Sequence, residues 1–98
     1  MIAPMRRAAR VDANQAEIVA ALRAAGAYVW LIGLPVDALC GYSGKTLLME
    51  FKTRTGKHTD LQSQFFRDWL GGPVATIRDV PGALSALRML EDKKEETE

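Results

Sequence analysis

The chain has 98 residues, of which 48% are hydrophobic and 26% are charged, and its formal net charge is +1. This composition excludes a wholly disordered protein, and the length leaves room for one domain with one small core. Cys40 is the only cysteine, which excludes an intrachain disulfide and a metal site built from cysteines.

The two ends of the chain differ in charge from its middle. Residues 1–11 carry three arginines (+3), whereas residues 91–98 carry five acids and two lysines (−3). We expect a flexible basic arm at 1–11, one domain at 12–90 and a charged tail at 91–98. No apolar run fits a signal peptide or a membrane span, so the expected location is the cytoplasm. A core this small is marginal alone, which favours a homodimer.

The first half of the chain is predicted to form one helix and three strands. Asp12 and Gln15 have the spacing of a capping box, and apolar residues at helical spacing follow until Gly26 ends the helix. Runs rich in β-branched, aromatic and aliphatic residues then predict strands at 27–33, 35–41 and 45–52. A tight turn at 42–44 joins the last two strands.

The second half of the chain is predicted to contain two helices and one strand. Thr59 and Gln62 again have capping-box spacing, and apolar residues recur every four positions from Leu61 until 71–73 ends the helix. A short fourth strand at 74–77 and a last helix at about 81–90 follow. The whole order predicts an α/β domain in which helices flank a small mixed sheet.

Three charged residues lie on one face of the predicted hairpin. If its turn is centred at 43–44, the numbers of opposed residues sum to 87, so Asp37 lies opposite Glu50. Glu50 and Lys52 are two residues apart in one strand and therefore share a face. Two opposed carboxylates repel unless a cation lies between them, and they supply the hard oxygen ligands that Mg²⁺ prefers. The Lys52 ammonium can offset negative charge on a reacting phosphate.

At these positions the sequence resembles the PD-(D/E)XK nuclease superfamily. Asp37, a gap of twelve residues and then Glu50-Phe51-Lys52 match the pattern of that superfamily. Within it, the chain is most similar to the small stand-alone VRR-NUC proteins of phages and bacteria. These proteins share a Glu on the first helix, strands like LPVDAL and MEFK, and an early Gln on the next helix. The corresponding helical residues here are Glu17 and Gln62, and the similarity covers roughly residues 10–90.

The resemblance implies a restriction-endonuclease-like αβββαβ core and a metal-dependent DNA endonuclease that uses Mg²⁺ or Mn²⁺. Asp37, Glu50 and the backbone carbonyl of Phe51 would bind the metal. Glu17 would reach the metal directly or through a water molecule.

The resemblance also implies the remaining roles and the substrate. Lys52 would position the attacking water, and Gln62 would brace Lys52 or the scissile phosphate. The products would carry 5′-phosphate and 3′-hydroxyl ends. Stand-alone members of the family act as homodimers on branched DNA, in particular on four-way (Holliday) junctions.

Several of these residues have a second interpretation. The capping box with Thr59 explains Gln62 equally well, and Glu17 can simply complement the positive end of its helix. His58 lies in a polar loop, and we expect it to be solvent-exposed rather than a phosphate contact.

Three basic residues flank the strand of the site and its outgoing loop. These residues are the predicted contacts to the DNA backbone: Lys45, Arg54 and Lys57. Two other functions fit the same pattern. One is a nuclease of the same superfamily that acts on flaps or single strands, and the other is a non-catalytic nucleic-acid-binding protein of this fold.

Overall fold

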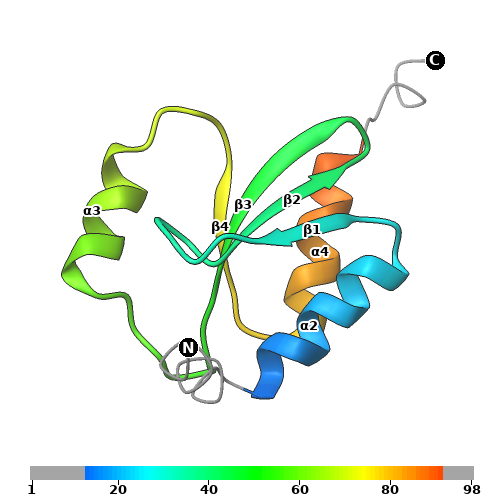
Figure 1. The fold of residues 1–98 in the computed structure, drawn as a ribbon, viewed down its shortest axis with the longest axis horizontal. Coiled ribbons are helices and arrows are strands. Elements are labelled where there is room, and N and C mark those ends of the chain that lie inside the picture. The colour runs from blue at the N-terminus through cyan, green and yellow to red at the C-terminus, as the bar shows by residue number, and fades with distance from the viewer. Residues whose placement is uncertain (1–12, 92–98) are drawn as a thin grey trace, which may run out of the picture.

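The computed structural model describes residues 13–91. Its helices and strands, labelled as in Figure 1, are α2 (Ala13–Ala24), β1 (Tyr28–Leu31), β2 (Ala38–Tyr42), β3 (Lys45–Phe51), α3 (Asp60–Asp68), β4 (Val74–Ile77) and α4 (Val80–Leu90). This is the predicted order of elements, and it confirms a mixed α/β domain. The predicted arm, the Asp12 cap and all of the predicted tail except its first residue lie outside the described residues.

The four strands form one mixed sheet in the order β1-β2-β3-β4. β1, β2 and β3 are successively antiparallel, while β4 runs parallel to β3 after the crossover through α3. In the hairpin, Ala38 lies opposite Met49 and Tyr42 opposite Lys45, which is the predicted register. Its two turn residues, at 43 and 44, have φ angles of 57° and 78°, as a two-residue hairpin turn of type I′ requires.

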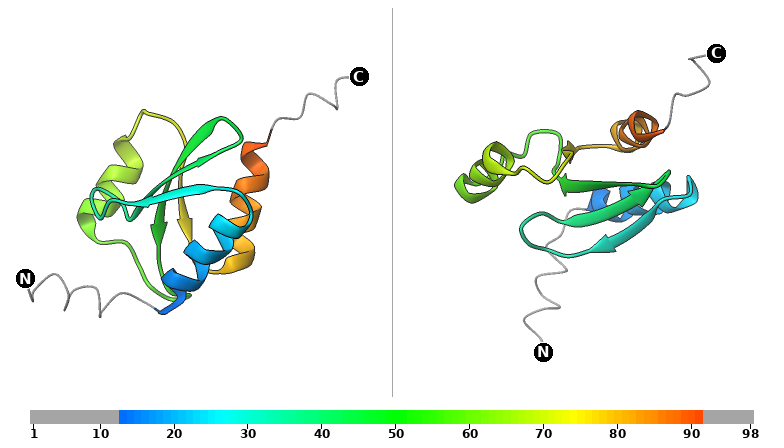
Figure 2. Two further views of the ribbon diagram at one scale, coloured as in Figure 1. Left: turned by 45° about the vertical axis from the view of Figure 1, so that its right-hand side comes forward. Right: turned by 90° about the horizontal axis from the view of Figure 1, so that it is seen from above.

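The two faces of the sheet have different surroundings. α2 and α4 lie together against one face, and α3 lies apart from them on the other side of the molecule (Figures 1 and 2). The covered face and the two helices supply the core, whose fully buried side chains are Ile18, Leu22, Ala38, Cys40, Met49 and Ala83. The opposite face, which we call the open face, carries Tyr28, Trp30, Leu39, Leu48, Glu50 and Thr76, as the strand registers show.

Some boundaries differ from the predicted ones. β2 begins at Ala38 rather than at residue 35, because the preceding loop folds back and the Asp37 carbonyl accepts hydrogen bonds from the amides of Ile32 and Gly33. α3 ends at Asp68, before the glycines at 71–72. α4 begins at Val80 because the Asp79 side chain accepts a hydrogen bond from the Gly82 amide. Within residues 13–91, no helix is long and apolar enough to cross a membrane.

Candidate active site

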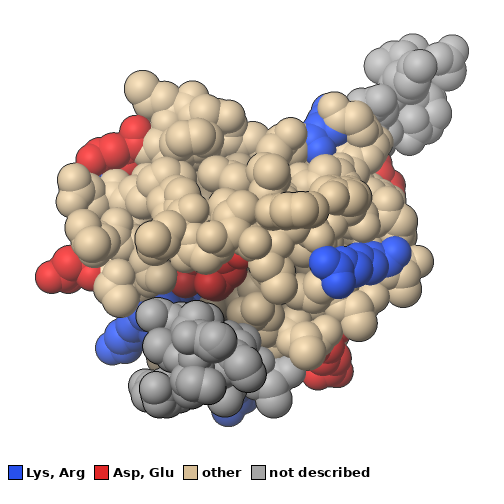
Figure 3. Space-filling view, in the orientation of Figure 1, with Lys and Arg blue, Asp and Glu red and all other residues tan. Residues whose placement is uncertain are grey.

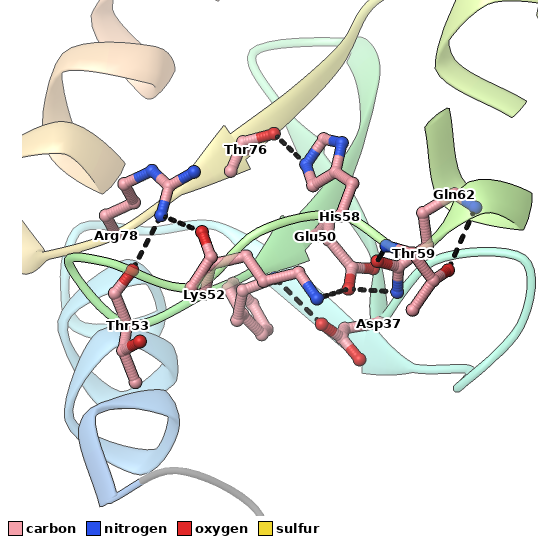
Figure 4. A network of polar contacts seen from close by, with 11 residues as sticks. Asp37, Glu50, Lys52, Thr53, His58, Thr59, Gln62, Thr76 and Arg78 are labelled. Carbon is pink, nitrogen blue, oxygen red and sulfur yellow. Dashed lines mark hydrogen bonds and ion pairs between the residues drawn. The ribbon is translucent and has the colours of Figure 1, made fainter. Parts of the chain in front are cut away.

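The site is built around Glu50, near the end of β3. Its side chain lies on the open face, yet the residue is only 3% exposed. Asp37 comes directly before β2, at the position that extends the register to Glu50. The Asp37 Oδ2 accepts a hydrogen bond of 2.8 Å from the Phe51 amide, which fixes this carboxylate at the end of β3. Figure 4 shows the carboxyl groups of Asp37 and Glu50 on the same side of the strand ends.

The two oxygens of the Glu50 carboxylate have different environments. Oε2 accepts a hydrogen bond of 2.6 Å from the Gln62 amide nitrogen and lies 3.5 Å from the Lys52 Nζ. Oε1 is buried and has no hydrogen-bond partner among residues 13–91. Burial raises the pKa of Glu50, the nearby Asp37 charge raises it further, and Lys52 opposes both. A buried acceptor without a partner is unfavourable in a folded protein, so Oε1 is available to a ligand.

Gln62 forms the capping box expected from the sequence and also contacts the site. Its amide oxygen accepts a hydrogen bond from the Thr59 amide at 3.0 Å, and the Thr59 hydroxyl accepts one from the Gln62 amide at 3.2 Å, so the capping box is present. The side-chain nitrogen donates to Glu50, whose Oε2 also pairs with Lys52, and the role of Gln62 in bracing Lys52 or the scissile phosphate stays a prediction. The Gln62 side chain therefore takes part in the N-terminal cap of α3 and also connects that helix to the site.

The backbone of Lys52 is held from two directions. Its amide donates to the Ile77 carbonyl at 3.0 Å, and its carbonyl accepts from the Asn14 side chain of α2 at 3.3 Å. Its own side chain is 17% exposed, so the ammonium reaches the edge of the site while its stem is buried. Asn14 was not singled out from the sequence, because a helical Asn carries no signal for a partner 38 positions away.

Glu17 is not brought into this cluster. It lies one helical turn after Asn14, but its side chain is exposed. No hydrogen bond or ion pair within the described part of the chain joins it to Asp37 or Glu50. Its role as a ligand, directly or through water, stays a prediction.

The loop after β3 is ordered by residues that sequence reasoning missed. The Arg78 guanidinium donates to the carbonyls of Thr53 and Gly56, each at 2.7 Å. His58 shares a hydrogen bond of 2.8 Å with the Thr76 hydroxyl, and its ring centre lies 4.5 Å from that of Phe66. The expectation of a solvent-exposed histidine is wrong: Thr76 pairs with Glu50 in the sheet, so its hydroxyl faces the site and binds the imidazole.

His58 is also affected by its charged neighbours. Burial lowers its pKa, and the positive charges of Lys52 and Arg78 lower it further. At neutral pH the imidazole is therefore uncharged and makes no ion pair with Glu50. In the sequence, Thr76 and Arg78 are marked only as polar residues on either side of the last apolar residue of a short strand, which is a weak signal for a site.

The three basic residues predicted to contact DNA do not cluster. Arg54 and Lys57 are exposed in the loop that leaves the site. Lys45 begins β3, roughly 20 Å from its end at about 3.3 Å per residue, and its Nζ donates to the Leu90 carbonyl at 2.9 Å. The grouping of Lys45 with the site is therefore wrong. On the face shown in Figure 3, Lys and Arg side chains lie at separate places and form no continuous patch.

The oxygen atoms around Glu50 fit a hard metal ion such as Mg²⁺. Glu50 Oε1 lacks a partner within the described chain, and a second carboxylate lies beside it at Asp37. The carbonyl of Phe51 projects to the same edge of β3 as its amide, which points at Asp37. Between residues 13 and 91, no three His, Cys, Asp or Glu side chains gather to hold a metal, so water would complete the coordination, as is usual for Mg²⁺.

No protein-family model, curated protein or solved structure matches this chain. The function is therefore inferred from the geometry of the site itself. The residues that the structure brings together are Asp37, Glu50, Lys52 and Gln62, with the Phe51 backbone between them.

Proposed function

We propose that the protein is a metal-dependent nuclease that hydrolyses phosphodiester bonds of DNA, with a core of the PD-(D/E)XK type. The observation that carries the proposal is the buried Glu50 carboxylate, whose Oε1 has no partner in the described part of the chain while Asp37 and Lys52 lie beside it. A structural ion pair would satisfy both oxygens of such a buried carboxylate. In a cation site without its ion, one of the two carboxylate oxygens lacks a partner.

The residues of the site divide the chemistry between them. Asp37, Glu50 and the Phe51 carbonyl would hold Mg²⁺ or Mn²⁺. Such an ion, when bound, lowers the pKa of its water and withdraws charge from a phosphate oxygen. Lys52 holds an ammonium at the rim of the site, where it stabilises negative charge that develops on the phosphate. Gln62 keeps the Glu50 carboxylate in one orientation.

The proposed substrate is branched DNA, four-way junctions in particular, and this preference derives from the sequence resemblance. Arg54 and Lys57 are the proposed contacts to its backbone, because both are exposed in the loop next to Lys52. Replacing either with Ala should reduce the dependence of binding on salt by about one phosphate contact. An unchanged salt dependence in both variants would remove this loop from the interface.

The homodimer is also part of the proposal. The open face exposes Tyr28 (63%), Trp30 (58%) and Leu39 (39%), and the rings of Tyr28 and Trp30 stack at 6.3 Å. Exposed apolar groups that adjoin one another favour association. Sedimentation should show a dimer that Trp30→Glu dissociates. A wild-type protein that is monomeric at every concentration would contradict this part of the proposal.

A panel of labelled DNA substrates tests the nuclease directly. Four-way junctions, flaps, nicked and linear duplexes and single strands are incubated with Mg²⁺, Mn²⁺ or EDTA. We expect cleavage with either metal and none with EDTA. Preferential cleavage of flaps or single strands would show that these, and not four-way junctions, are the substrates. DNA binding without cleavage would favour a non-catalytic binding protein.

Variants connect the activity to the site. Asp37→Asn, Glu50→Gln and Lys52→Ala should each abolish cleavage while circular dichroism and DNA binding stay close to wild type. Asp60→Asn is the matched control, because it removes an exposed carboxylate from the first turn of α3. Metal-dependent cleavage at wild-type rate by the Glu50 or Lys52 variant would exclude that residue from the mechanism.

A further inference from the structure

A groove of about 770 Å³ lies between α3 and the loop that joins β1 to β2. We call it the base groove and define it by Leu34, Pro35, Leu61, Gln62, Phe65 and Trp69. Its volume is within the range of about 300–1,000 Å³ that is usual for small-ligand sites. Thr59, Gln64 and Asp68 also line the groove, and none of its lining residues carries a positive charge, so the groove is not a second site for phosphate.

The base groove begins where the active site ends. Gln62 lines the groove and at the same time donates to the Glu50 Oε2 at 2.6 Å. Asp37, on the other side of Glu50, ends the loop that carries Leu34 and Pro35. Figure 4 shows Gln62 beside the Glu50 carboxylate, on the side of α3. A group bound in the groove is therefore an immediate neighbour of a phosphate bound at Glu50 and Lys52.

The walls of the groove are flat, apolar and uncovered. The rings of Phe65 and Trp69 lie 5.1 Å apart at 32°, and Leu34 and Leu61 are 83% and 77% exposed. Within the described chain, α3 has no buried residue, so these side chains do not serve as core. Exposed apolar groups gathered in a concave site mark a binding surface.

The Trp69 ring lies against Gly71, where a Cβ atom would overlap the ring. Asp68 also lines the groove, and its carboxylate pairs with Arg67 at 3.0 Å. The aromatic rings of Phe65 and Trp69 offer a stacking surface of the kind that binds unpaired bases.

We propose that the base groove binds one unstacked nucleobase of the DNA, from the nucleotide adjacent to the phosphate that is cleaved. This inference rests on the proposed nuclease function and names its substrate class. Bases within a continuous duplex are paired and stacked, so they cannot enter the groove without being extruded. The substrate is therefore DNA with an unpaired nucleotide at the cut site, as at a junction, flap or single-stranded gap.

Fluorescence of Trp69 tests the inference without requiring cleavage. The chain has two tryptophans, so Trp30→Phe leaves Trp69 as the single reporter, and Glu50→Gln in the same protein prevents hydrolysis. Titration with a single-stranded oligonucleotide should quench Trp69. The same oligonucleotide with abasic sites, and a blunt duplex, should quench it far less. Equal quenching by the normal and abasic strands, or no quenching at all, would overturn the proposal.

Binding measurements on two variants complete the test. Trp69→Ala should weaken binding of gapped DNA roughly 5- to 150-fold, the loss expected for one base–aromatic stack. Gly71→Ala should weaken it in the same direction, since it displaces the ring but retains the tryptophan. Leu70→Ala is the matched control, because Leu70 is 96% exposed and does not line the groove. Equal affinity of wild type and Trp69→Ala for gapped DNA would overturn the proposal.

The cleavage assay separates failure of this inference from failure of the proposed function. Metal-dependent cleavage that Trp69→Ala leaves unchanged on every substrate contradicts the base groove alone. Quenching of Trp69 by unpaired bases in a protein that cleaves nothing contradicts the nuclease and supports the groove as a base-binding site.

Discussion

The two faces of the sheet differ in what they contribute: one supplies the core and the other carries the candidate active site. The face under α2 and α4 is apolar throughout its buried positions, and its contacts join elements from both ends of the described chain. The open face carries a buried carboxylate, exposed aromatic rings and, beside it, a helix with no buried residue. Stability is thus concentrated on one side of β3, and the groups capable of chemistry on the other.

This division explains how so small a domain can contain a costly site. A buried carboxylate with an unpaired oxygen destabilises the fold, and α3 buries too little to hold itself in place. The packed face can offset these losses because its side chains are removed from water almost completely. Functional sites commonly retain such unfavourable groups. Three measurements test this division between the two faces.

The largest effect is expected in the packed face. Leu22→Ala removes a side chain that is fully buried between α2 and the sheet, and it should lower the free energy of unfolding by about 2–5 kcal/mol. Leu61→Ala is the matched control on α3, since Leu61 is 77% exposed, and it should change stability by less than about 0.5 kcal/mol. Urea denaturation followed by circular dichroism measures both. Equal losses of unfolding free energy in the two variants would show that the packed face and α3 contribute equally to stability.

A smaller and local effect is expected at the junction between the two regions. Gln62→Ala removes both the hydrogen bond to Glu50 and one half of the capping box. It should lower the free energy of opening α3 by about 1.5–3 kcal/mol, the value of a hydrogen bond to a charged group. Amide hydrogen exchange should accelerate in α3 and stay unchanged in β2 and β3.

Gln64→Ala is the control for this experiment, because Gln64 is exposed on the same helix and makes no part of the capping box. If α3 exchanges at the same rate in the Gln62 and Gln64 variants, the helix is held by its other contacts and not by Glu50.

The smallest effect has the opposite sign. Glu50→Gln should stabilise the metal-free protein by about 0.5–2 kcal/mol at neutral pH, since it removes a buried charge and keeps the shape. The pKa of Glu50 is raised above its ordinary value of 4.5, chiefly by burial, so the fold favours the neutral acid. The protonated Glu50 therefore contributes to the stability of the wild type below pH 4.5. This contribution is lost as the pH rises through the pKa of Glu50 in the folded protein.

Thermal unfolding in EDTA at several pH values measures this difference. The advantage of Glu50→Gln should be absent near pH 4 and should grow as pH increases. Mg²⁺ should then raise the melting temperature of the wild type and leave the variant unchanged. A variant that is less stable than wild type at pH 8 would show that Glu50 serves the fold rather than the site.

The sequence determined the elements and the hairpin register. Runs of β-branched, aromatic and aliphatic residues define the strands, and the turn at 43–44 fixes the pairing because a slip by one residue would turn every buried side chain outward. Asp37 and Glu50 could therefore be placed opposite each other, and Lys52 beside them, from local patterns alone. The capping box at Thr59 was equally local and equally visible.

The distant groups around the site became visible only in the three-dimensional fold. Asn14, His58, Thr76 and Arg78 reach the site across separations of 18 to 64 positions, and hydrogen bonds of that range leave no periodic signal in a sequence. The fold also places Lys45 far from the site, because Lys45 begins β3 and the site lies at the other end of this strand. Local order is set by short-range sterics and patterning. Contacts between distant segments are set by which segments the core brings together.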